Sequence, residues 1–336
     1  MGIDPFERVA IGDTGVAISR LGLGGVFVGG RELDDGSSAA YETALATLDH
    51  AYEIGVRYFD TAPLYGQGRS EKRFGKVLGR RPRNSFVLST KVGRLLVPDD
   101  ENPGHWPEDD LPRLKARFDL SRDGIFRAME EGLERHGLGH AEILYLHDPD
   151  VENLESDAVA TAFPALLEMK QQGIVKAIGT GMNQWEMPAR FLERFDLDVI
   201  LLAGRYTLLD QVAYPEFLPL CLKKGVKIVT GGPFNSGILA ASDLDQPVWF
   251  NYRQAAPEWI AKAKALKSVC ARHGVDLRAA ALQFPLAHPA VASVIPGAAS
   301  PAQVEENAAL IRADIPADLW TEMKHEGLIP EDAPTP

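Results

Sequence analysis

Four residues with reactive or ionisable side chains lie at or just after the ends of short apolar segments. Asp60 lies in YFDTA, Tyr65 follows five residues later, Lys91 is near the end of FVLSTKV, and His147 ends ILYLH. A free phenol has a pKa of about 10 and is a poor acid or base at neutral pH. A nearby ammonium favours the phenolate, and a carboxylate can hold that ammonium. The four residues therefore predict proton transfer at Tyr65, with His147 sharing the proton or orienting a carbonyl oxygen.

Eight short apolar segments predict the strands that must position these residues. They span residues 21–25, 58–62, 86–92, 143–147, 175–181, 199–204, 226–232 and 292–297. Each is a short apolar run rather than an alternating one, as expected for parallel strands that helices cover on the outside. Helical patterns separate them, for example Leu45, Leu48 and Tyr52 on one face. Eight strands each followed by a helix predict an α/β fold, a single (β/α)8 TIM barrel.

The barrel prediction comes with a domain division. Residues 8–19, around a Gly-Asp-Thr-Gly turn, predict an N-terminal β-hairpin, and residues 329–336 form a polar tail after one domain of residues 1–328. A doubly wound open sheet is the alternative, but Phe27 stands where the third glycine of a dinucleotide fingerprint would fall. Adjacent barrel strands are about 4.8 Å apart, so side chains at their ends can converge. A lysine and an aspartate alone would equally fit a structural ion pair.

Two long connections interrupt the pattern of strands and helices. They span residues 94–120 and 235–257, and both follow predicted strands. In a barrel they would lie on the carboxyl-end face, where active sites are built. Trp106 and Trp249 lie in these loops and are candidate substrate-binding residues, because an aromatic face can pack on a sugar or pyridine ring. Packing within the loop is an equally good interpretation of each tryptophan.

Charge and composition narrow the class of protein. The formal net charge is −12 and no long Lys/Arg run is present, which argues against nucleic-acid binding. No window approaches 18 uninterrupted apolar residues and no signal peptide is evident, so we expect a cytoplasmic protein without a membrane span. Cys221 and Cys270 read as buried thiols. The histidines and cysteines have no metal-ligand spacing, and no Gly-x-Ser-x-Gly hydrolase elbow occurs.

Four motifs resemble the aldo-keto reductase family. They are DTAPLYGQGRSE at 60–71, STK at 89–91, YLHD at 145–148 and VIPGAASPAQVEEN at 294–307, in the family's order. The resemblance runs from the N-terminal hairpin to about Leu310. It implies a nicotinamide-dependent oxidoreductase whose catalytic residues are Asp60, Tyr65, Lys91 and His147.

The resemblance also implies where the cofactor binds, with departures from the family pattern. Many members have Ser-Asn after the fifth strand, whereas this chain has Gly181 and Met182 there and Asn183 one position later. Ala203 stands in place of the usual glutamine, and Gly231 in place of the tyrosine that often stacks on the nicotinamide. The next segment still matches the loop over the pyrophosphate, which gives Pro233, Asn235, Ser236, Gly237 and Leu239 as further cofactor-binding candidates.

The last strand-to-helix turn indicates which cofactor is used. Family members that prefer NADP commonly place a lysine and an arginine there, and this chain has Gly297 and Gln303. Without these charge-assisted bonds to the 2′-phosphate, each of about 1.5–3 kcal/mol, NAD is expected. Glu306 and Asn307 are then expected at the adenine end. Arg253 in the second long loop is the cation that could reverse this preference.

The substrate expectation follows from the same resemblance. With NAD, the chain is most similar to the aldose-oxidising branch of the family, to which pyridoxal-oxidising enzymes are near relatives. Tyr65 as phenolate would take the hydroxyl proton while hydride leaves carbon, so that a sugar hemiacetal gives a lactone. The alternatives are an NADP-dependent aldehyde or ketone reductase and a cofactor-binding regulatory subunit. A barrel glycosidase would need a second carboxylate, and none is evident at a strand end.

Overall fold

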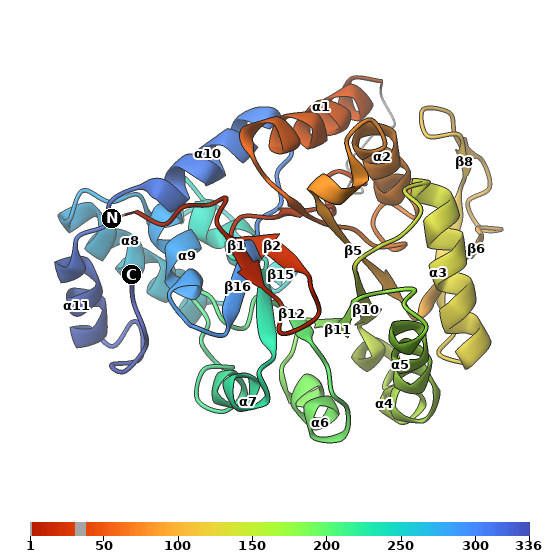
Figure 1. Ribbon diagram of the computed structural model, residues 1–336. Coiled ribbons are helices and arrows are strands. Elements are labelled where there is room, and N and C mark those ends of the chain that lie inside the picture. Colours follow the sequence, from red (N-terminus) through yellow and green to blue (C-terminus); the bar gives the residue numbers. More distant parts are fainter. Residues whose placement is uncertain (1, 31–37) are drawn as a thin grey trace.

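The computed structural model describes residues 2–30 and 38–336. Within these residues, one eight-stranded parallel sheet is present, and its main chain closes on itself (Figure 1). The Gly22 amide donates to the Val294 carbonyl at 2.9 Å, and Gly24 pairs with Gly297. The strands are β3 (Leu23–Gly24), β4 (Tyr58–Asp60), β5 (Val87–Val92), β10 (Ile143–His147), β11 (Ala177–Met182), β12 (Val199–Ala203), β13 (Lys227–Gly231) and β16 (Val291–Ile295). The predicted (β/α)8 barrel is confirmed.

Helices surround this barrel and cover the outer faces of the strands. In Figure 1, α1, α2 and α3 follow one another around one side, and α8, α9 and α10 lie on the other. The helices are α1 (Ser38–Ile54), α2 (Arg69–Leu78), α3 (Arg122–His136), α4 (Glu155–Asp157), α5 (Phe163–Gln171), α6 (Glu186–Arg194), α7 (Phe217–Lys224), α8 (Pro257–Arg272), α9 (Leu277–Leu286), α10 (Pro301–Arg312) and α11 (Ala317–His325). Ser300 caps α10 and accepts a hydrogen bond from the Gln303 amide, with Pro301 in the first turn.

Each apolar strand serves two hydrophobic cores, because successive side chains point to opposite faces. In β10, Ile143 and Tyr145 belong to the core inside the barrel, whereas Leu144 and Leu146 belong to the larger core under the helices. The hairpin of β1 (Arg8–Ala10) and β2 (Ala17–Ser19) lies across one end of the barrel, where Ile18 joins the inner core. This end carries the amino termini of the strands, so the carboxyl end is the open one.

The two long connections form short hairpins rather than irregular loops. In the first, β6 (Arg94–Pro98) pairs with β9 (Leu114–Phe118), and β7 (His105–Trp106) pairs with β8 (Leu111–Pro112). In the second, the 3-10 segment η4 (Asn235–Ala240) precedes a hairpin of β14 (Trp249–Phe250) and β15 (Arg253–Gln254). Four of these strands have two residues each, too few for a period-2 pattern to be visible in the sequence.

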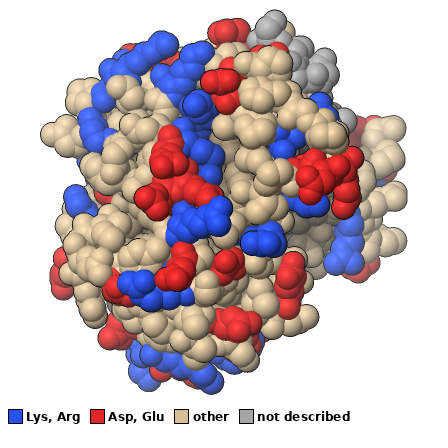
Figure 2. Space-filling view, turned by 90° about the vertical axis from the view of Figure 1, so that its right-hand side faces the viewer, with Lys and Arg blue, Asp and Glu red and all other residues tan. Residues whose placement is uncertain are grey.

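The expected polar tail packs against the barrel. Ile329 and Ala333 are buried in the outer hydrophobic core, and the Tyr214 hydroxyl donates to the Asp332 carbonyl at 2.9 Å. None of the helices within the described residues is long and apolar enough to cross a bilayer. On the side of the molecule shown in Figure 2, acidic and basic side chains are mixed. The exposed pair Arg127–Glu131 on α3, at 2.7 Å, is typical of such surfaces and adds little stability.

A buried ion pair fixes the first long connection to the barrel. Asp109, between β7 and β8, accepts two hydrogen bonds from Arg73 of α2, at 2.8 and 3.1 Å, and both side chains are almost fully buried. We expect Asp109→Ala to lower the free energy of unfolding by about 3–5 kcal/mol, because the buried Arg73 guanidinium loses both hydrogen bonds to this carboxylate. Urea unfolding checks this value, with Asp123→Ala as the control, at a side chain 96% exposed, for which we expect a loss of less than about 1 kcal/mol. Equal losses in the two variants would contradict it.

Candidate active site

An ion pair at the ends of two neighbouring strands forms the base of the site. Lys91 of β5 donates from Nζ to Asp60 Oδ2 of β4 at 2.7 Å and to the Thr61 carbonyl at 2.9 Å. Both side chains are 1% exposed. A buried charge is tolerated when it is paired and its remaining hydrogen bonds are made. The Ser89 hydroxyl meets this need for Asp60, since it donates to Oδ1 at 2.7 Å.

Tyr65 lies above this ion pair, in the loop between β4 and α2. The Lys91 ammonium is 4.6 Å from the centroid of its ring, and the His147 ring lies edge-on to it, with centroids 5.8 Å apart. The turn after Tyr65 requires glycine: Gly66 has a φ of 59°, and a Cβ there would lie 2.0 Å from the Gly29 carbonyl oxygen. The structure thus brings all four predicted residues to the carboxyl end of the barrel.

The protonation of these residues differs in part from the sequence expectation. Burial and the Asp60 charge raise the pKa of Tyr65 well above its usual value, whereas the sequence predicts a pKa lowered by Lys91. Burial also raises the pKa of Asp60, and the Lys91 charge opposes that shift. For His147, burial and the charges of Lys91 and Arg94 lower the pKa well below its usual range. At neutral pH the site therefore presents a protonated phenol and a neutral imidazole.

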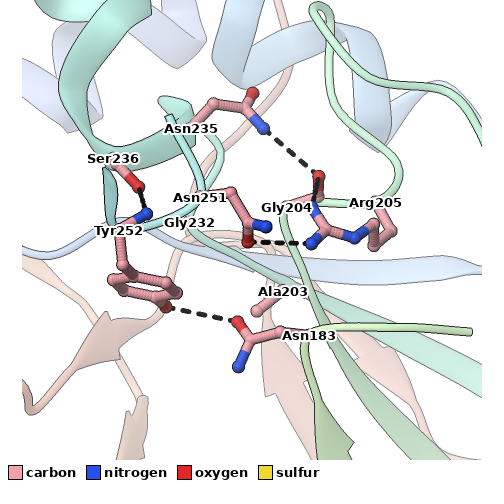
Figure 3. Close-up of a pocket in the computed structure, with 9 residues that line it drawn as sticks. All are labelled: Asn183, Ala203, Gly204, Arg205, Gly232, Asn235, Ser236, Asn251 and Tyr252. Atoms are coloured by element: carbon pink, nitrogen blue, oxygen red, sulfur yellow. Dashed lines mark hydrogen bonds between the residues drawn. The ribbon is translucent and has the colours of Figure 1, made fainter. Parts of the chain in front are cut away.

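A second polar region lies at the ends of β11, β12 and β13 and is closed on one side by the β14–β15 hairpin (Figure 3). We call it the mouth pocket; its nine lining residues are Asn183, Ala203, Gly204, Arg205, Gly232, Asn235, Ser236, Asn251 and Tyr252. The Tyr252 hydroxyl donates to Asn183 Oδ1 at 3.2 Å, and its amide donates to Ser236 Oγ at 3.1 Å. Arg205 donates to Asn251 Oδ1 at 2.8 Å. The pocket thus combines side-chain amides, two hydroxyls and one guanidinium.

Several predicted cofactor residues lie in or beside this pocket. Asn183, Asn235 and Ser236 line it. Asn235 is fixed by the Thr207 hydroxyl, which donates to Oδ1 at 2.7 Å. Gly181 lies beside the ion pair, because a Cβ there would lie 3.4 Å from Lys91 Cε.

Other predicted cofactor positions are placed differently. Gly237, next to Ser236, has a φ of 98°, and no atom lies near a Cβ built there. The Pro233 side chain is buried, and Leu239 is 1% exposed in the outer hydrophobic core. The Leu239 side chain is therefore part of the packing, and only its main chain could contact a ligand.

The predicted adenine end lies on α10 and the turn before it. A Cβ at Gly297 would lie 2.3 Å from the Phe27 ring, and Gln303 Oε1 accepts from the Ala299 amide at 2.8 Å. Glu306 accepts a hydrogen bond from Arg278 at 2.7 Å, and Arg278 is also paired with Asp276 at 2.7 Å. Asn307 is 7% exposed.

The two loop tryptophans proposed from the sequence as substrate contacts differ in their surroundings. The Trp106 ring is already covered by Arg69 and Arg113, whose guanidinium carbons lie 4.0 and 4.7 Å from its centroid. Loop packing therefore accounts for Trp106. Trp249 is 56% exposed on β14, and Arg253 is exposed on β15.

Sequence reasoning missed three residues of the mouth pocket, namely Arg205, Asn251 and Tyr252. Arg205 could have been predicted from the sequence, because it directly follows the segment predicted as the sixth barrel strand. Asn251 and Tyr252 form the turn of the β14–β15 hairpin, where both have left-handed backbones with φ of 51° and 62°. No pattern in the sequence links that turn to Asn183, which is 69 residues away.

Known proteins with similar sequences and structures agree with this arrangement of residues. The aldo/keto reductase family model matches residues 20–325. D-threo-aldose 1-dehydrogenase of a Pseudomonas species is 42% identical, over 94% of this chain and 96% of that protein. Pyridoxal 4-dehydrogenase of Microbacterium luteolum is 38% identical, over 98% and 100%. The holo form of an aldo-keto reductase from Bacillus halodurans superposes with a TM-score of 0.75 at 25% identity, over 95% and 96%. The chain belongs to the aldo/keto reductase family and is an NAD(P)-dependent oxidoreductase.

Proposed function

We propose that this protein oxidises the hemiacetal form of an aldose to a lactone, with NAD as the hydride acceptor. The observation that carries the proposal is the position of Tyr65, which lies over the Lys91 ammonium and edge-on to His147. The similarity to D-threo-aldose 1-dehydrogenase supports the substrate class. A cyclic sugar presents a carbon that bears both a hydroxyl group and a hydrogen, and its oxidation releases one proton and one hydride.

Side chains of the protein transfer the proton, and the cofactor accepts the hydride. Neutral His147 donates one hydrogen bond to the anomeric oxygen and orients it. Tyr65 first loses its phenol proton to solvent and then, as the phenolate, accepts the hydroxyl proton; the Lys91 ammonium stabilises this phenolate. Because burial and Asp60 raise the pKa of Tyr65, the phenol carries its proton at neutral pH and can donate it in the reverse reaction. The cofactor, when bound, supplies the hydride acceptor and, in its oxidised form, a second positive charge.

The residues of the mouth pocket fit a nicotinamide cofactor. Asn183 offers an amide that can pair with a carboxamide, and the Arg205 guanidinium can contact a pyrophosphate. The backbone at Asn235 and Ser236 is left-handed, with φ of 48° and 59°, as in anion-binding turns. Ala203 and Gly231 are neighbours in the sheet register, and both are smaller than the family residues usual at these positions. We assign cofactor contacts to Gly181, Asn183, Asn235, Ser236 and Gly237.

The preference for NAD rests on the charges around α10. Phe27 leaves no room for a lysine side chain at position 297, and Gln303 is uncharged. The nearest cation to Glu306 is Arg278, which two carboxylates already hold. Among the described residues, the first three turns of α10 contain no Lys or Arg, and the Glu306 carboxylate would repel a 2′-phosphate there. Glu306 and Asn307 are instead suited to the hydroxyl and amino groups of adenosine.

A charge introduced at position 303 tests this account of cofactor choice. We expect Gln303→Arg to tighten NADP binding about 10- to 150-fold, the range of one charge-assisted hydrogen bond, with little change for NAD. Titration of both cofactors by fluorescence quenching measures the two Kd values. Gln303→Ala is the control, because it loses the same bond to the Ala299 amide without adding charge. Wild-type protein that binds NADP more tightly than NAD would contradict the proposal.

Product analysis tests the proposed reaction itself. With L-fucose and NAD, we expect NADH and lactone to form in equal amounts, with hydroxylamine trapping the lactone as a hydroxamate. NADH formation without a trappable lactone would overturn the proposed product. A second candidate substrate is pyridoxal, which the 38% identity to pyridoxal 4-dehydrogenase favours. Pyridoxal also forms an internal hemiacetal, so the same residues would yield a lactone from it.

A further inference from the structure

A charged cluster lies directly beside the proposed reaction centre and has no role in the mechanism above. Arg94 begins β6 just after the end of β5, and Asp148 follows His147 at the end of β10. These two barrel strands are neighbours. Asp148 Oδ2 lies 3.3 Å from His147 Nε2, and Asp150 lies two residues further along the chain. The cluster is thus formed by residues at two adjacent strand ends.

The cluster leaves hydrogen-bonding capacity unused. Arg94 Nη2 is 3.7 Å from Asp148 Oδ2, well beyond the roughly 2.7–2.9 Å of a charge-assisted hydrogen bond. Arg94 Nε and Asp150 Oδ1 are buried and have no hydrogen-bond partner among the described residues. The structural pair of Arg73 and Asp109 instead makes two short bonds. Buried groups left incomplete in this way are unfavourable unless a ligand or water completes them.

The cluster is held rigidly and faces the reacting groups. The Arg94 guanidinium carbon lies 4.1 Å from the centre of the Phe118 ring, and the Arg94 and Asp148 side chains are 12% and 13% exposed. The charge of Asp148 also raises the pKa of Tyr65, so its carboxylate is close enough to act on that phenol. A substrate whose reacting carbon lies between Tyr65 and His147 would place its adjacent carbon near this cluster.

The chemistry of the cluster indicates what it recognises. A hydroxyl between Arg94 and Asp148 can donate to the carboxylate and accept from the guanidinium, which completes both. We propose that Arg94, Asp148 and Asp150 form a hydroxyl-recognition subsite that selects substrates bearing a hydroxyl on the carbon next to the oxidised or reduced one. The inference rests on the proposed function and narrows its substrate class to polyhydroxylated compounds. It favours aldoses over simple alcohols and aldehydes.

A matched pair of aldehydes tests the subsite in the reduction direction. Glyceraldehyde carries a hydroxyl next to its carbonyl, and propanal has the same carbon chain without it. With NADH, we expect wild-type kcat/KM to favour glyceraldehyde about 10- to 150-fold, and Asp148→Asn to reduce this preference to less than about threefold. Arg94→Met should reduce it in the same direction. Asp123→Asn, at a side chain 96% exposed, is the control and should keep it.

The ratio of the two substrates separates recognition from damage to the site, because a distorted site slows both. A wild-type protein without preference, or an Asp148→Asn variant with the wild-type preference, would overturn the subsite. If glyceraldehyde is preferred but no aldose is oxidised with NAD, the proposed function fails and the subsite stands. If aldoses are oxidised and no preference is seen, the subsite alone fails.

Discussion

Tyr65→Phe should lower kcat for aldose oxidation about 10²- to 10⁴-fold, which is the usual contribution of one positioned proton-transfer group. The substitution removes only the hydroxyl, and the phenylalanine ring can keep the edge-on contact with His147 and the contact with the Lys91 ammonium. Initial rates at saturating NAD and sugar measure the effect. The loss should be equal in kcat and in kcat/KM, because the hydroxyl acts in the transition state.

Cofactor affinity is the control for Tyr65→Phe. The mouth pocket is built from other residues, so the Kd for NADH should stay within about twofold of wild type. A variant that keeps more than about a tenth of the wild-type kcat would show that another group transfers the proton. His147 would then be the first residue to re-examine, because its ring is adjacent.

Lys91→Met should reduce activity to a similar extent for a different reason. Loss of the ammonium removes the charge that stabilises the phenolate of Tyr65, and it strands the buried Asp60 carboxylate. In the reduction direction, the alkaline limb of the pH–rate profile reports ionisation of the proton donor. Because removal of a positive charge raises the pKa of a phenol, we expect this limb to move to higher pH. A limb that moves to lower pH would contradict the role given to Lys91.

A double variant separates this effect from loss of stability. Lys91→Met alone should cost about 3–5 kcal/mol in the free energy of unfolding, because Asp60 remains buried without its partner. Asp60→Asn together with Lys91→Met removes the stranded charge and should recover most of that stability, while activity stays low. If activity returned together with stability, the ion pair would be structural and Lys91 would have no part in proton transfer.

The barrel could be predicted because each strand lies in a short, largely apolar run and helical patterns separate the runs. β10 matches residues 143–147, whereas β11 begins at Ala177 rather than Val175. The convergence of Asp60, Lys91 and His147 follows from the same pattern, since all three lie at the carboxyl ends of neighbouring strands. Strand position alone was therefore enough to assemble most of the site.

Features that depend on contacts between distant segments could not be predicted. The direction of the Tyr65 pKa shift depends on burial, which no local pattern reveals. The contact of Tyr252 with Asn183 and the pairing of Arg278 with Glu306 each join residues far apart in the sequence. The incomplete pairing of Arg94 likewise depends on the distance between its guanidinium and the Asp148 carboxylate. The sequence shows only that an arginine follows the third barrel strand.

The initial rate of NADH formation from NAD tests the central claim most directly. The panel is L-fucose, D-arabinose, L-galactose, pyridoxal and simple alcohols that lack a neighbouring hydroxyl. The structure predicts rapid NADH formation with at least one of the three sugars and a far lower kcat/KM for the simple alcohols. No turnover of any sugar with NAD, together with ready reduction of aldehydes by NADPH, would contradict both the proposed substrate class and the proposed cofactor.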